Sequence, residues 1–201
     1  MKKIILGLTA AALVAFAACK KDDSTSYDNH SSPLMKAMHD MDDSMQAMKM
    51  TKDPDHDFAM MMMMHHMGAI NMANYELANG TDATIKAMAQ TIKAAQMKER
   101  ATLDSFVMAH NPTAMVMAMM DSLNASMNRM PGKADALKLT GQSDHDFAHL
   151  MIVHHTSAVE MASAEIMYGQ VPFMKNMATM MKADQTKEIA DFQAWLNGGK
   201  D

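Results

Sequence analysis

The chain has 201 residues, of which 30 are methionine and one is cysteine, and its formal net charge is −5. This length suffices for one domain with a hydrophobic core. Helix-forming Ala, Met, Lys and Gln are abundant, while glycine, proline and β-branched runs are scarce, so the composition predicts an all-α protein. The acidic charge argues against a nucleic-acid partner and fits a cationic one.

Residues 1–18 predict a secretory signal peptide, because Lys2 and Lys3 precede an apolar stretch and small residues stand before Cys19. The arrangement resembles a bacterial lipobox. We therefore expect lipidation of Cys19 and a lipoprotein anchored in the bacterial envelope, on the periplasmic face or the outer-membrane surface. An ordinary signal peptide with an incidental cysteine is the alternative. Cleavage removes two lysines and leaves a net charge of −7. Residues 19–33 then predict a flexible, lipidated tether.

Residues 34–197 read as a single domain that contains a tandem duplication. A shift of 89 residues aligns 55–73 with 144–162, with 11 of 19 positions identical, and the similarity extends over repeats of 34–107 and 123–196. Each repeat predicts a short Met-rich helix followed by a hairpin of two longer helices. Two tandem hairpins predict a ferritin-like four-helix bundle.

The expected helix boundaries follow from acidic, glycine and proline residues. The first long helix should begin near Asp55 or Asp144 and end at a glycine, Gly80 or Gly169. The second long helix should span 83–109 or 172–196. The Met-rich helix of the second copy should span 113–130, and we expect Pro131-Gly132 to break the chain after it.

Positions that are identical in the two copies recur at steps of four and three along the first long helix, which is the spacing of one helix face. We therefore expect the two first long helices to face each other across a pseudo-two-fold axis, with both histidine pairs inward. The shared face comprises Phe58, Met62, His65, His66, Ala69, Met72 and Glu76, and in the second copy Phe147, Met151, His154, His155, Ala158, Met161 and Glu165.

Adjacent histidines on a buried face are costly unless their nitrogens are engaged, and the neighbouring thioethers favour copper, Cu(I) in particular. The second helices can bring Gln96, Glu99, Gln185 and Glu188 toward the same core. The alternative is a set of core histidines that bond only to Glu76 or Gln96. The candidate metal ligands are Met62, His65, His66, Met72, Glu76, Met151, His154, His155, Met161, Glu165, His56, His145 and His149.

The last three of these candidates lie outside the shared inward face. His145 and His149 are one helical turn apart and are candidates for chelating Cu(II) at the surface. His56 and His145 have a second interpretation as ordinary residues at a helix start.

The stretches HDFAMMMMMHHMGAINMA and HDFAHLMIVHHTSAVEMA resemble the signature of domain-of-unknown-function family 305, as do Ala89, Ile92, Gln96 and Glu99. The resemblance covers nearly all of the chain after Cys19. It implies a ferritin-like helical bundle in the bacterial envelope. It also implies copper as a ligand, because characterised relatives include Met-rich periplasmic proteins that bind copper and protect against it, whereas others have no assigned role.

The sequence thus predicts an envelope lipoprotein that sequesters Cu(I) or Cu(II), with no catalytic residues. Its partners would be metal ions, the membrane through Cys19, and a copper-transfer protein whose identity is open, as is the oligomeric state. One alternative is a metal-free protein whose methionines absorb oxidants or bind a partner. A ferritin-like oxidase is less well supported, because no Glu-x-x-His motif occurs in the chain.

Overall fold

The computed structural model describes residues 27–113 and 115–198. These residues form one short 3-10 helix, Asn29–Ser31, and six α-helices, with no strand among them. The all-α class is therefore confirmed. The signal peptide and Cys19 lie outside the described residues. The α-helices are α1 (Pro33–Gln46), α2 (Pro54–Asn79), α3 (Ala83–Ala109), α4 (Met117–Asp135), α5 (Ser143–Tyr168) and α6 (Pro172–Asn197).

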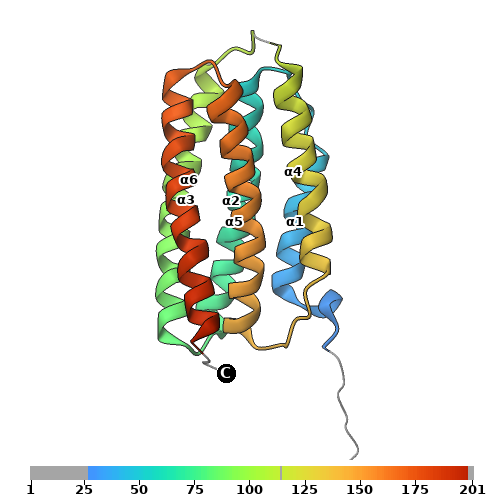
Figure 1. The fold of residues 1–201 in the computed structure, drawn as a ribbon, viewed down its shortest axis with the longest axis vertical. Helices are drawn as coiled ribbons and strands as arrows, with labels where there is room; N and C mark the ends of the chain where they lie inside the picture. The colour runs from blue at the N-terminus through green and yellow to red at the C-terminus, as the bar shows by residue number, and fades with distance from the viewer. Residues whose placement is uncertain (1–26, 114, 199–201) are drawn as a thin grey trace, which may run out of the picture.

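The helices form three layers, each containing one helix from each repeat (Figure 1). The α2 and α5 helices lie in the middle, with α3 and α6 on one side and α1 and α4 on the other. The hairpins α2–α3 and α5–α6 make the expected four-helix bundle, and the Met-rich helices α1 and α4 cover its second face. Because α2 and α5 are covered on both sides, their side chains meet the core around most of the helix circumference.

Reciprocal hydrogen bonds between the two repeats fix the antiparallel pairing of α2 with α5. At one end, the Asp144 carboxylate accepts from the backbone N–H groups of residues 81 and 82, at 3.0 and 2.9 Å. At the other end, the Asp55 carboxylate accepts from the N–H groups of residues 170 and 171, at 3.0 and 2.8 Å. Each aspartate lies in the first turn of the central helix of one repeat, and its carboxylate accepts hydrogen bonds from backbone N–H groups in the interhelical loop of the other repeat. The expected pseudo-two-fold arrangement is therefore present.

The central helices end at Gly80 and Gly169 as expected, but for a different reason. Their φ angles are −68° and −58°, so neither residue needs the left-handed conformation that usually selects glycine. A Cβ at Gly80 would instead overlap the Glu76 carboxyl group, and one at Gly169 would overlap that of Glu165. Both glycines leave room for a buried carboxyl group one turn earlier.

The predicted break at Pro131-Gly132 is wrong, because α4 continues through Pro131 to Asp135. Proline removes one backbone hydrogen bond from the ladder of the helix. Met130 and Ala134 stand on both sides of this point and are both buried in the core, so packing holds the helix together across the proline. The same helix begins at Met117, four residues later than expected.

The end of the expected tether is folded. Asn29 donates a hydrogen bond to the carbonyl oxygen of Leu137 at 2.6 Å and accepts one from the N–H of Leu139 at 3.2 Å. Ser32 then caps α1 by accepting from the N–H of Met35. These contacts hold residues 29–32 against the α4–α5 connection. In the described part of the chain, no helix is both long enough and apolar enough to cross a membrane.

Candidate metal centre

Four histidines lie wholly buried where α2 and α5 cross. His65 and His66 on α2 and His154 and His155 on α5 each have 0% exposed surface. The His65 and His154 rings stack across the pseudo-two-fold axis, with ring centres 3.7 Å apart and planes inclined by 34°. The prediction that both pairs turn inward is therefore confirmed. We call these four residues the histidine core.

The hydrogen bonds of the core fix the tautomer of His154. Its Nε2 lies 2.9 Å from the carbonyl oxygen of His65, which can only accept, so Nε2 carries the proton. In a neutral ring Nδ1 is then an acceptor, and it lies 3.4 Å from Nδ1 of His155. If His155 donates to it, Nε2 of His155 is unprotonated and faces Oε2 of Glu188 at 2.8 Å. The proton between these last two atoms then belongs to Glu188.

Burial keeps the rings of His65, His154 and His155 neutral. Loss of water contact holds the pKa of His65 and of His154 well below the ordinary value, and repulsion from the neighbouring histidines adds to the effect. Burial lowers the pKa of His155 to about 3, and burial together with nearby Glu99 raises that of Glu188 to about 7. A neutral imidazole is the form that binds a metal, so His65, His154 and His155 need not lose a proton first.

The ring nitrogens of His65 and of His66 have no partner in strict hydrogen-bond geometry. Nε2 of His66 nevertheless faces Oε2 of Glu99 at 2.8 Å, and the His65 ring comes close to the backbone of His154. A buried polar atom without a partner carries a desolvation cost of about 1–3 kcal/mol. Four thioethers, Met62, Met72, Met151 and Met161, are also completely buried on the same two helices. Free imidazole nitrogen and thioether sulfur are the donor types that suit copper, so the residues present fit the metal that the sequence predicts.

A groove between α3 and α6 leads toward the histidine core from the surface. It has a volume of about 480 Å³, and its lining includes Gln96, Glu99, Gln185 and Glu188. Oε2 of Glu99 lies 2.8 Å from Nε2 of His66, which matches the contact between Glu188 and His155 in the other repeat. Both glutamates are about one-fifth exposed, so they connect the buried rings to solvent.

Among residues 27–113 and 115–198, no three His, Cys, Asp or Glu side chains stand ready-placed around a common metal position. The core is instead closed by its own short contacts, such as the ring stack of His65 and His154. Metal binding there requires the rings to turn or thioethers to join them. Methionine, with its unbranched side chain, is well suited to such adjustment.

Glu76 and Glu165 are not in the histidine core, contrary to their place among the predicted ligands. Glu76 accepts a hydrogen bond from the Ser143 hydroxyl at 2.6 Å at one end of the bundle, and burial raises its pKa to about 7. Glu165 lies at the opposite end beside Asp55, where burial raises its pKa to about 9. The sequence correctly placed both glutamates on the same helix face as the histidines. They are not near the histidine core because each lies about three helical turns beyond the histidine of its own helix, His65 or His154.

The remaining predicted ligands lie near the start of the central helices. His145 and His149 are partly buried neighbours with ring centres 4.5 Å apart, as their spacing predicts. Burial and repulsion from His145 lower the pKa of His149. His56 is the first-copy counterpart of His145, and its nearest ionic neighbour is Asp57, 3.9 Å away. The structure brings none of these three into contact with the histidine core.

Glu99 and Glu188 were not among the predicted metal ligands, although the sequence placed both among the residues that the second long helices can bring toward the core. Both residues are glutamate in both copies, at the same position of the second long helix, and this identity was the available signal. The spacing within one helix cannot show which of its faces meets the neighbouring helix, so the contact required the structure.

The fold and the core together define a helical-bundle protein with a duplicated, buried histidine site. The chain belongs to the family described as "Domain of unknown function (DUF305)", which matches residues 17–107 and 55–196. A solved fragment of a DUF305 protein from Deinococcus radiodurans has a similar fold, with 20% sequence identity and a TM-score of 0.54 over 72% of this chain and 95% of that one. No curated protein matches the chain.

Proposed function

We propose that this protein binds and sequesters copper outside the cytoplasm. The observation that carries the proposal is the buried pair of His65 and His154 on facing helices, with ring centres 3.7 Å apart and neither ring nitrogen of His65 in strict hydrogen-bond geometry. Burying a polar group without a hydrogen-bond partner destabilises the fold, whereas a bound metal would give the ring nitrogen a partner.

Copper suits the surrounding donors better than other metals of the envelope. The thioethers of Met62, Met72, Met151 and Met161 are soft ligands and favour Cu(I), while imidazole accepts either Cu(I) or Cu(II). The chain has a single cysteine, Cys19, and it lies outside the described residues. Methionine supplies a soft donor that cannot form disulfides in an oxidising compartment. The role is binding rather than catalysis.

The predicted lipid anchor at Cys19 would keep the protein at the envelope membrane, where copper enters from outside. This proposal rests on the sequence of residues 1–19 alone. An anchored protein with an enclosed site would store copper or deliver it to a copper-transfer protein.

A metal-free role is the second candidate, and exposed methionines favour it. Six methionines among the described residues present large exposed surfaces, where an oxidant would reach them first: Met97, Met108, Met115, Met117, Met167 and Met180. Methionine sulfoxide can be reduced back, so such side chains can serve as a renewable oxidant sink. In that case the histidine core would be purely structural.

Titration of the full chain with Cu(I) against a competing chelator tests the proposal. The variant His65→Gln/His154→Gln keeps polar side chains of similar size but removes the central nitrogens. We expect it to lose at least about 100-fold in copper affinity, more than the loss of a supporting residue costs.

The matched control is His39→Gln. His39 is a partly exposed histidine that pairs with Asp135 away from the core. We expect the control variant to bind copper as the native chain does. If the double variant stays folded and binds copper equally well, the histidine core is not the site, and the oxidant-sink function becomes the better account.

A further inference from the structure

The groove between α3 and α6 contains buried amide groups that the fold leaves without hydrogen-bond partners. Gln96 and Gln185 occupy equivalent positions in the two repeats, line the groove and are each 3% exposed. Neither amide atom of Gln96 has a partner, and Oε1 of Gln185 has none either. Burying such a group destabilises the fold. A ligand that donates N–H groups would supply the hydrogen bonds that these two oxygens lack.

The groove is long and narrow. Its lining follows one face of α3 over residues 84–99, which corresponds to about 22 Å of helix, and its volume is about 480 Å³. Ala87 and Thr91 of this lining stand where the second repeat has Asn176 and Met180. The small side chains of the first repeat therefore leave open a channel that suits an unbranched, extended molecule.

The lining of the groove is acidic. Its carboxyl groups belong to Glu99, Asp184, Glu188 and Asp191, and Lys187 at the same groove pairs with Asp191 at 2.5 Å. If Glu188 is protonated, as in the tautomer described above, the other three carboxylates and this lysine leave a formal charge of −2. Asp184 and Asp191 are seven residues apart on α6, or about 10 Å along its axis. The negative charge is thus spread along the groove.

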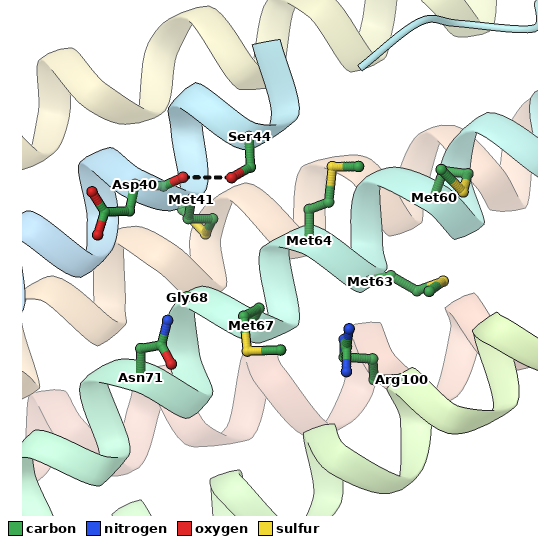
Figure 2. A pocket seen from close by; sticks show the side chains of 10 residues that line it. All are labelled: Asp40, Met41, Ser44, Met60, Met63, Met64, Met67, Gly68, Asn71 and Arg100. Carbon is green, nitrogen blue, oxygen red and sulfur yellow. Dashed lines mark hydrogen bonds between the residues drawn. The ribbon is translucent and has the colours of Figure 1, made fainter. Parts of the chain in front are cut away.

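The groove between α1, α2 and α3 differs from it in charge (Figure 2). That groove has a volume of about 300 Å³ and is lined largely by methionine side chains, among which Arg100 places its cationic group. Arg100 would repel a cationic ligand there, whereas the α3–α6 groove would attract one. Charge therefore distinguishes the two grooves.

We propose that the α3–α6 groove binds a linear aliphatic polyamine. Its separated ammonium groups pair with the carboxylates of Glu99, Asp184 and Asp191. An ammonium group between these positions donates to the amide oxygens of Gln96 and Gln185. The methylene spacers lie along the apolar part of the wall, as is usual for a small-molecule site with a few polar groups.

A single metal ion fits the same groove less well. In the part of the chain that the structure describes, no three His, Cys, Asp or Glu side chains surround a common position. Carboxylates spaced along a channel match charges that are themselves spaced along a chain. This inference does not depend on copper, because none of its ligand contacts involves a ring nitrogen or a thioether.

Calorimetric titration of the full, metal-free chain with spermidine, a linear triamine, tests the inference. Thr91→Met introduces the residue that the second repeat has at this position, and it narrows the groove without changing its charge. Gln96→Leu/Gln185→Leu removes the buried amides. We expect each variant to bind spermidine at least about 10-fold more weakly, because hydrogen bonds to charged groups are among the stronger ones. The His65→Gln/His154→Gln variant should bind spermidine as the native chain does.

Asp184→Asn and Asp104→Asn form a matched pair. Both residues are exposed, but only Asp184 lines the groove. We expect the first variant alone to weaken spermidine binding. Equal affinity in the native chain, Thr91→Met and the glutamine variant would overturn the inference. So would equal losses in the two aspartate variants, or displacement of spermidine by Mg²⁺ at the same concentration of charge, since either result would show that the chain attracts any counter-ion.

Discussion

At the scale of single residues, buried ionisable side chains have pKa values that are shifted toward their neutral forms. The two ring nitrogens of His65 and the two carboxyl oxygens of Glu165 are buried out of strict hydrogen-bond geometry, with the backbone of His154 near the first and the Asp55 carboxyl group near the second. The structure keeps the first neutral by lowering its pKa and the second neutral by raising its pKa. Both groups are therefore uncharged at neutral pH, although they lie at different levels of the bundle.

Glu165→Gln should change how stability depends on pH. The pKa of Glu165 in the folded protein is about 9, against an ordinary value of 4.5. The protonated side chain therefore makes its full contribution to the free energy of unfolding below pH 4.5, and this contribution is lost progressively as pH rises toward 9. This loss amounts to about 1.4 kcal/mol per pH unit at most. Urea unfolding between pH 5 and 8 should show a flatter pH profile in the variant than in the native chain.

Asp40→Asn is the control for that measurement. It makes the same carboxyl-to-amide change at an exposed carboxylate that pairs with Lys36 on α1. Its stability should change by no more than about 1 kcal/mol, with the pH slope of the native chain retained. If Glu165→Gln and the native chain have parallel pH profiles, Glu165 is not held protonated by the fold.

At the scale of helices, the ends of α2 and α5 are shaped by side chains of the preceding turn. Gly80→Ala and Gly169→Ala should each destabilise the fold by about 1–3 kcal/mol, because the new methyl group displaces a buried glutamate. The φ angles themselves suit alanine, but the added Cβ would also lie 2.7 Å from the backbone oxygen of Glu76 and 2.6 Å from that of Glu165. Thermal or chemical unfolding measures the effect.

Gly132→Ala is the matched control, since a Cβ there meets nothing within 4 Å and the residue lies inside α4. Helix propensity alone then predicts a gain of about 0.5–1 kcal/mol. A destabilisation of equal size at all three glycines would contradict the steric explanation for Gly80 and Gly169.

The helices themselves were largely predictable from the sequence, because the duplication let the two halves of the chain be compared. The α3 helix has the expected limits of 83–109, and α6 ends one residue beyond the expected 196. The failure at Pro131 has a tertiary cause: burial of Met130 and Ala134 outweighs the local preference of proline. Local sequence does not carry that information.

At the scale of the whole molecule, the site was predictable only in part. Periodicity correctly turned both histidine pairs inward. It also placed Glu76 and Glu165 on the same face, but could not show that their distance along the helix puts them at opposite ends of the bundle. The contacts of Glu99 and Glu188 depend on how α3 and α6 rotate against the central pair, which only packing of the complete bundle determines.

The duplication gives the molecule two equivalent halves around a shared centre, and the proposal places copper at that centre. The two halves diverge at their outer faces, where the first repeat has Met60, Met63, Met64 and Met67 and the second has His149, Ile152, Val153 and Thr156.

Anomalous diffraction at the copper absorption edge, from crystals of the copper-loaded protein, tests the central claim most directly. We predict an anomalous peak about 2.0–2.1 Å from a ring nitrogen of His65 or His154, which is the usual length of a metal–imidazole bond. Copper bound only at places remote from all four core histidines, with the His65–His154 stack intact, would contradict the account.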